Sequence, residues 1–172
     1  CGVIVFDAPI TSIGDYAFRD CTSLTSVTIP DSVTSIGYEA FRYCSSLASI
    51  TIPNSVTSIR ERAFEGCTGK LIVNCNIPSS SSVYDNPFYE SNFKKATIGD
   101  KVTSIGACAF SWCTELTTIV IPESVTEIGD HAFYYCKSLT SVTIGDGVTT
   151  IEDYAFSFAF KSMPSVYSLP TA

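Results

Sequence analysis

The sequence predicts a solenoid, a fold in which short segments of similar sequence stack on one another as successive coils. The first observation is a repeated block. Ile36–Val56 reads IGYEAFRYCSSLASITIPNSV, and a matching block, IGDYAFRDCTSLTSVTIPDSV, begins 23 residues earlier at Ile13. Further copies begin at Ile105 and Ile128. The second observation is that apolar residues recur at the same offsets in each copy. Because a fixed period of this length is typical of repeat proteins, we treat the chain as one stack of coils.

Each copy is expected to hold one strand that ends at a turn. In Ile36–Val56, Leu47, Ile50 and Ile52 follow the pattern L-x-x-I-x-I, whose last three residues alternate as a strand with one buried face does. Pro53 has no backbone N–H to donate, so the strand is predicted to end there. The two residues that follow are polar turn formers.

The other half of each copy is predicted to form a short outer segment. Ala40, Phe41 and Cys44 recur at helical spacing, over a length of about one or two turns. One coil alone should be unfolded, because ordering its backbone costs about 1–2 kcal/mol per residue, more than its apolar side chains return. Stacked coils share their buried faces and their strand hydrogen bonds, so the array is expected to fold as a unit.

The full pattern, L-x-x-I-x-I-P-x-S-V-x-x-I-G-x-x-A-F-x-x-C, resembles the BspA-like class of bacterial leucine-rich repeats. The resemblance covers nearly the whole chain, and the A-F-x-x-C portion distinguishes this class from other leucine-rich repeats. It implies a curved solenoid with a parallel sheet on its inner face and short helical turns outside. The predicted fold class is therefore an α/β solenoid, mainly β by content, forming a right-handed leucine-rich-repeat superhelix with 23-residue repeats.

The same resemblance implies a function. Members of this class are typically cell-surface or secreted proteins, often adhesins that bind host proteins or other cells. We therefore expect a noncatalytic binding or adhesion scaffold, extracellular or at the cell surface, that recognises a host protein or a glycan. The alternative is a structural spacer that displays a separate domain. The resemblance carries over no catalytic residue and implies no cofactor.

The chain, 1–172, is predicted to form a single solenoid with two departures from the repeat. The first is an irregular coil at about 69–96, which lacks an A-F-x-x-C unit but leaves the later register unshifted. Its outer segment is expected to be a loop plugged by aromatic side chains, Phe88 and Tyr84. The second is a decayed repeat at 157–172, where the pattern fades.

The composition excludes some partners. Charged residues make up 16% of the chain, the net charge is −7 and the pI is about 4.5, whereas nucleic-acid binding calls for a basic stripe. The same acidic balance argues against binding to an anionic membrane surface. No apolar run approaches the 18 or so residues of a spanning helix, so direct membrane insertion of this segment is not expected.

Most of the eight cysteines fall on a single position of the repeat. Side chains stacked at equivalent positions point in parallel, which favours buried thiols acting as small apolar groups over disulfides between neighbouring coils. The cysteines that share this position are Cys21, Cys44, Cys67, Cys113 and Cys136.

Catalysis and metal binding have little support. His131 is the single histidine, and its position holds outward-facing residue types in the other repeats, so no partner is expected to complete a nucleophile–base pair. The cysteines show no C-x-x-C motif, which argues against zinc. An acidic position after the strand could form a calcium ladder, but solvated turn residues are the favoured interpretation. Ice binding by the threonine-rich sheet face is disfavoured because Ile72, Asn74 and Lys95 interrupt it.

The most informative candidate site is the position just before the cysteine. On three consecutive coils it holds Trp112, Tyr135 and Phe158, and Tyr134 lies beside them. One interpretation is that these rings pack on each other and cover the outer turns. The other is an exposed aromatic strip that binds a protein or a carbohydrate ligand, since rings of this kind are common anchors at interfaces.

Overall fold

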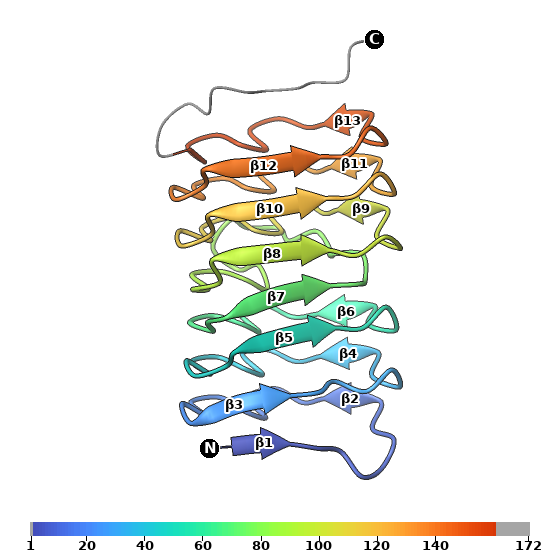
Figure 1. Cartoon of the computed structure of the whole chain (residues 1–172), viewed down its shortest axis with the longest axis vertical. Helices are drawn as coiled ribbons and strands as arrows, with labels where there is room; N and C mark the ends of the chain where they lie inside the picture. Colours follow the sequence, from blue (N-terminus) through green and yellow to red (C-terminus); the bar gives the residue numbers. More distant parts are fainter. Residues whose placement is uncertain (1, 161–172) are drawn as a thin grey trace.

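The computed structural model of the protein describes residues 2–160 as a stack of coils with two rows of parallel strands (Figure 1). A broad row forms one face, and a narrow row of two-residue strands lies behind it, so the expectation of one strand per copy is wrong: a regular coil holds two. The broad row consists of β1 (Gly2–Ile4), β3 (Leu24–Val27), β5 (Ser49–Ile52), β7 (Lys70–Val73), β8 (Lys95–Ile98), β10 (Thr118–Ile121) and β12 (Ser141–Ile144). The narrow row consists of β2 (Ser12–Ile13), β4 (Ser35–Ile36), β6 (Ser58–Ile59), β9 (Ser104–Ile105), β11 (Glu127–Ile128) and β13 (Thr150–Ile151).

The strand pairing follows the repeat. Thr118 pairs with Ser141 on one side and with Lys95 on the other, one repeat away in each direction. At the irregular coil, Ser49 pairs with Lys70, two residues short of the repeat, and Lys70 pairs with Lys95, two residues beyond it. The two deviations cancel, which explains why the sequence returns to register. The five strands from β5 to β12 therefore form one continuous parallel sheet.

A column of stacked phenylalanine rings runs through the core. Consecutive rings from Phe18 to Phe156 lie 4.9–5.5 Å apart between centroids, close to the spacing of parallel strands. Rows of buried isoleucine, valine and leucine from both strand rows surround the column. Each coil thus contributes one ring to a core that no single coil could enclose. The members of the column are Phe18, Phe41, Phe64, Phe88, Phe110, Phe133 and Phe156.

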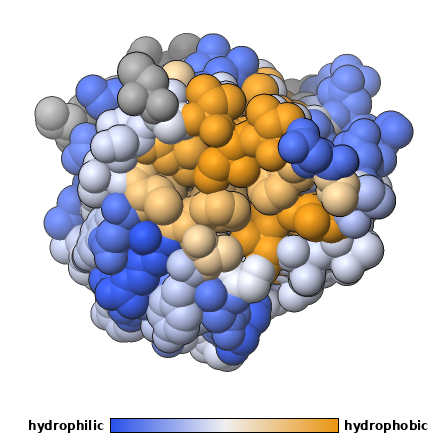
Figure 2. Space-filling model, turned by 90° about the horizontal axis from the view of Figure 1, so that it is seen from below, coloured by the Kyte–Doolittle hydropathy of each residue, from blue (hydrophilic) through white to orange (hydrophobic). Residues whose placement is uncertain are grey.

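The core is less enclosed at the first coil than inside the stack. Figure 2, which views the stack from the β1 end, shows apolar side chains gathered on this face. Val3 and Val5 are 64% and 72% exposed, and Phe18 is half-buried, whereas Phe41 in the next coil is fully buried. The phenylalanine column is therefore fully shielded only by coils on both sides.

The outer segments are not helical, so the predicted α/β class is wrong: residues 2–160 contain no helix. Only alternate backbone N–H groups bond within the segment, as Arg42 does when it donates to the carbonyl of Glu39 at 3.1 Å. The N–H groups between them donate to carbonyls of the next coil. The N–H of Phe41 donates to the carbonyl of Ala63, and the N–H of Tyr43 donates to that of Glu65. A helix would bond every N–H within itself. Here the outer segments form a ladder of turns between coils.

Left-handed backbone at two positions of each turn also prevents helix formation. Glu39 and Tyr43 have φ of 51° and 59°, and their equivalents in other coils share this region. Such φ values are unfavourable for residues other than glycine and interrupt a right-handed helix. The second of these positions is the one that carries the predicted aromatic residues. Its described members with positive φ are Asp20, Tyr43, Gly66, Glu90, Trp112, Tyr135 and Phe158.

The cysteine column consists of free thiols, which confirms that prediction and adds a role. Cys44 and Cys67 are fully buried, and each Sγ donates a hydrogen bond to a phenylalanine carbonyl of the preceding coil, at 3.1 and 2.9 Å. Cys113 and Cys136 do the same at 3.2 and 3.0 Å. Cys21 in the first coil is half-buried. The thiols are therefore donors between coils as well as small apolar groups.

The irregular coil keeps the core but changes the turn. Phe88 is fully buried between Phe64 and Phe110, so its predicted role as a plug is confirmed. Tyr84 is 50% exposed, so the same prediction for that ring is wrong. Buried Asn86 holds this turn instead. Its side-chain amide donates a hydrogen bond to the carbonyl of Ser111 and accepts one from the N–H of Phe88.

Three predictions stay predictions. The structure gives no test of the superhelix handedness or of the division of the chain into a single domain. The decayed repeat at 157–172 lies outside the described residues except for its first four positions, where Ala159 is buried at the cysteine position.

Candidate functional site

The outer turns of the first coils carry a buried ionic network that the sequence analysis missed. Arg19 contacts Glu39 at 2.7 Å, and Arg42 contacts both Glu39 and Glu65 at 3.0 and 2.7 Å. Arg62 continues the series toward the irregular coil by contacting the carboxylate of Asp85 at 3.3 Å. We call these residues the ionic ladder. It was missed because Glu39 shares a position with His131, which was interpreted as outward-facing, yet Glu39 is only 3% exposed.

The ionic ladder changes the protonation of its central carboxylate. Burial alone would raise the pKa of Glu39, but hydrogen bonds from Arg42 and Tyr38 and the charges of Arg42 and Arg19 outweigh it and lower the pKa below the ordinary value. The carboxylate is therefore held in its charged form inside the outer turns. The charges of this network are paired within the protein, which indicates a structural role, although Glu65 Oε2 and the Nε atoms of Arg42 and Arg62 have no hydrogen-bond partner.

The later coils bring the predicted aromatic residues together. The ring centroids of Trp112 and Tyr135 lie 4.1 Å apart, and those of Tyr135 and Phe158 lie 6.1 Å apart. The ring centroid of Tyr134 lies 5.9 Å from that of Tyr135 and 5.7 Å from that of Phe158. Tyr84, from the irregular coil, extends the group by packing on Trp112 at 5.6 Å. We call these five residues the aromatic strip.

The aromatic strip lies outside the core and is partly open to solvent. Phe158 is 68% exposed and Tyr84 is 50% exposed, while Trp112, Tyr134 and Tyr135 are half-buried. Both interpretations made from the sequence therefore describe the geometry, since the rings pack on one another and also present accessible edges. Tyr84 was assigned to the core rather than to this group, because its loop gives no repeat position from which to place it.

Cations stack on the aromatic rings of the outer turns. The Nζ of Lys137 lies 3.8 Å from the centre of the Tyr135 ring. The guanidinium of Arg42 lies 4.6 Å from the ring centre of Tyr43, and that of Arg62 lies 5.0 Å from Tyr89. These contacts draw on the attraction between a positive charge and the electron-rich face of the ring.

His131 has a partner that the sequence analysis did not predict. Its Nδ1 lies 2.7 Å from Oδ1 of Asp130, and its ring packs on Tyr134 and Tyr154 at 5.1 and 4.9 Å. Cys108, at the equivalent position one coil earlier, is a poor nucleophile, because burial and then the charge of Asp130 raise the pKa of its thiol. His131 and Cys108 therefore do not form an activated nucleophile.

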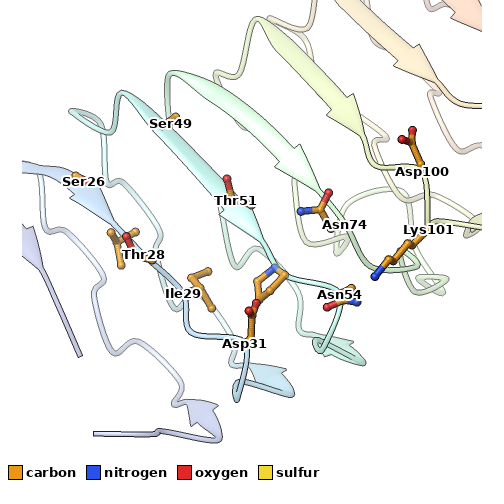
Figure 3. Close-up of a pocket in the computed structure, with 12 residues that line it drawn as sticks. Ser26, Thr28, Ile29, Asp31, Ser49, Thr51, Asn54, Asn74, Asp100 and Lys101 are labelled. Atoms are coloured by element: carbon orange, nitrogen blue, oxygen red, sulfur yellow. The ribbon is translucent and has the colours of Figure 1, made fainter. Parts of the chain in front are cut away.

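The broad sheet carries a separate hollow of about 650 Å³ (Figure 3). Hydroxyl groups from β3 and β5 line one side, and polar turn residues that follow the strands line the other. Asp31, Asn54 and Asp100 of the predicted acidic position are among them, together with Asn74 and Lys101. Across residues 2–160, no three histidine, cysteine or acidic side chains are placed to hold a metal ion.

The chain belongs to the family of the BspA type leucine-rich repeat region, whose model matches six copies over residues 3–86 and 81–166. The family consists in general of noncatalytic scaffolds, and leucine-rich-repeat proteins in general bind other proteins. A search of the curated proteins gave no match.

One solved structure shows the same fold, and a second is similar in sequence over most of this chain. A leucine-rich-repeat protein of T. pallidum is 23% identical with a TM-score of 0.57, over 87% of this chain and 71% of that one. A leucine-rich cell surface protein of Faecalibacterium prausnitzii is 27% identical with a TM-score of 0.43, over 91% of this chain and 51% of that one.

The described residues include no helix long and apolar enough to cross a membrane.

Proposed function

We propose that this protein is a noncatalytic binding scaffold that holds its ligand, a protein or a glycan, on the aromatic strip. The observation that supports this most directly is the position of the strip outside a core that is already complete. The phenylalanine column and the aliphatic rows fill the interior, so Trp112, Tyr135 and Phe158 are not required to close it. Partly exposed aromatic rings supply a large contact area at low entropic cost, which suits them to anchor a partner.

The ligand is expected to be a neutral or basic surface rather than a charged polymer of the same sign. The net charge of −7 repels nucleic acid and anionic lipid. We place the protein outside the cell or at its surface, a proposal supported by its membership of a repeat family that includes bacterial surface proteins.

The proposal is tested with the double substitution Trp112→Ala and Tyr135→Ala. Ligands are first sought by screening the wild-type chain against matrix proteins and a glycan array. The double variant should reduce affinity for any ligand found by at least about tenfold, since aromatic anchors at interfaces contribute about 2 kcal/mol or more each. Its unfolding midpoint in urea should fall only slightly, because the phenylalanine column is untouched.

A matched control is available within the chain. Tyr16 and Tyr84 are both 50% exposed and both lie on outer turns, but Tyr16 belongs to the first coil. Tyr84→Ala should weaken binding and Tyr16→Ala should not. If the double variant unfolds while the affinity of its folded fraction is unchanged, the rings belong to the structure, and the hollow on the broad sheet becomes the candidate surface.

The alternative from another class is a spacer that displays a separate domain of a longer protein. The regular stacking supports it, because a solenoid holds its two ends at a fixed separation. The two functions differ in whether this chain binds anything by itself. Absence of binding in both screens would favour the spacer.

A further inference from the structure

A second hollow, of about 460 Å³, lies on the outer turns where the ionic ladder meets the aromatic strip. It arises because the column of large side chains is interrupted. Between Tyr43 and Trp112, that column holds only Gly66 and Glu90. Gly66 is buried and lines the hollow, and a side chain there would collide with the ring of Tyr43. The hollow is therefore bounded by an aromatic ring at each end.

The lining carries negative charge and no positive charge. Two carboxylates, Glu65 and Glu90, contribute to it, together with the polar side chains of Ser45, Asn92 and Thr114. Glu65 is already paired with Arg42. Glu90 is exposed, and within residues 2–160 no lysine, arginine or histidine lies within ion-pair distance of it. The Glu90 carboxylate is hydrogen-bonded to the Tyr89 side chain, but its charge is not paired with a cation of the described residues.

The neighbouring aromatic rings show what such a space accepts. Tyr43, Tyr89 and Tyr135 each have an arginine or lysine of this chain stacked on one face. Trp112 packs on Tyr135 and Tyr84, and no cation of the described chain stacks on it. Tryptophan is the most favourable ring for this kind of contact. The hollow therefore combines an aromatic wall with a carboxylate, the two kinds of group that Arg42 contacts at Tyr43 and Glu65.

We propose that this hollow accepts a lysine or arginine side chain of a partner protein, with the cation between Trp112 and the carboxylate of Glu90 and with Tyr43 closing the far end. The inference rests on the proposed function, because it treats the aromatic strip as part of a protein-binding surface. It narrows that function to a partner with an exposed basic residue, in agreement with the acidic net charge of the chain.

The chain contains a single tryptophan, so its fluorescence reports directly on one wall of the hollow. The probes are the capped tripeptides Ala-Lys-Ala and Ala-Arg-Ala, with Ala-Gln-Ala as the uncharged comparison. The basic peptides should change the emission of Trp112 saturably with a dissociation constant of about 1 mM, weakening as salt is added. The glutamine peptide should give no saturable change.

Two variants locate the site. Glu90→Gln should weaken binding of Ala-Lys-Ala about three- to fivefold, as expected for loss of a partly exposed charge pair. Asn92→Lys, which places a competing cation at the rim, should abolish it. The matched control is Glu123→Gln, because Glu123 is an exposed acid that follows β10 and does not line the hollow.

Three outcomes would overturn the inference. These are equal binding of the lysine and glutamine peptides, an equal effect of Glu90→Gln and Glu123→Gln, or no saturable change with either basic peptide. Failure here is distinguishable from failure of the proposed function. If Trp112→Ala with Tyr135→Ala removes binding of a screened ligand while Glu90→Gln leaves it unchanged, the aromatic strip binds its ligand without using this hollow.

Discussion

The first and last coils share one backbone and one core but cover their outer turns differently. Around Glu39 and Glu65 the cover is the ionic ladder, with buried carboxylates paired to arginines. Around Trp112 and Tyr135 it is the aromatic strip. Glu65 and Tyr134 occupy the same position of the repeat, directly after the core phenylalanine. This position of the repeat therefore accepts either a charged or an aromatic side chain.

This difference shows which parts of the repeat are constrained. Residues that face the column of phenylalanine rings must be apolar and of fixed size, because close-packed interiors tolerate little change in volume. The outer turns need only be covered, which charged pairs or rings can both do. The ionic ladder pairs its charges within the protein, whereas the aromatic strip leaves ring edges accessible. A binding surface is therefore more easily accommodated on the later coils.

The largest expected effect comes from replacing equivalent residues of the two covers by alanine. Glu65→Ala removes a side chain that is 5% exposed and leaves Arg42 with one of its two carboxylate partners. Breaking a buried pair in this way should lower the free energy of unfolding by about 3 kcal/mol. Tyr134→Ala, at the same position of a later coil, should cost about 1 kcal/mol. Urea unfolding followed by circular dichroism measures both, and equal costs would contradict the distinction between the two covers.

A smaller effect should separate the two regions by pH. The pKa of Glu39 is lowered in the folded protein, so its carboxylate stabilises the fold above its unfolded pKa, and this contribution is lost as the pH falls through the folded pKa. The stability difference between wild type and Glu39→Gln should therefore be largest near neutral pH and shrink between about pH 5 and pH 3. Urea midpoints measured across this range test it. Glu115→Gln, at an exposed position of the later coils, is the control.

The smallest effect concerns a feature that the two regions share. Cys67 and Cys136 each donate to a phenylalanine carbonyl of the preceding coil, at 2.9 and 3.0 Å. Replacing either by alanine should cost about 1–2 kcal/mol, and the two costs should agree within about 0.5 kcal/mol. Unequal costs would mean that the outer cover influences the core beneath it.

The same thiols can be followed by their reactivity. Burial raises the pKa of both Cys67 and Cys136 well above the ordinary value, so neither is ionised at neutral pH. A thiol reagent should modify half-buried Cys21 first and the other two only in denaturant. Rapid modification of Cys136 in the folded protein would contradict its enclosure.

The sequence was sufficient to predict the stack, the broad row of strands, the thiol column and the plug at Phe88, because these depend on periodicity and on apolar character. It was not sufficient for the narrow row of strands, since one strand per copy was expected, or for the outer turns. Ala40, Phe41 and Cys44 have helical spacing, but their N–H groups are shared between coils, and this pairing is invisible in one repeat considered alone. The ionic ladder was missed for a similar reason, since Glu39 is buried by arginines of two coils.

The alignment of Trp112, Tyr135 and Phe158 was predictable, because equivalent positions of a solenoid stack. The membership of Tyr84 was not, since the irregular coil lacks the repeat pattern that would place it. The hollow at Gly66 was also missed. A glycine among bulky residues was visible in the column, but its meaning depends on the ring of Tyr43 that leans over it.

The ladder of turn hydrogen bonds has a mechanical consequence. Most regular coils are joined to their neighbours on three sides, through the broad strands, the narrow strands and the outer turns, but no strand pairing joins β3 to β5 in the broad row. At the irregular coil the narrow row is interrupted between β6 and β9, where a single bridge joins Ile77 to Ile105. Tension applied along the stack would therefore be expected to concentrate at these two interruptions, one in each row. The hollow between Tyr43 and Trp112 lies across the interruption in the narrow row.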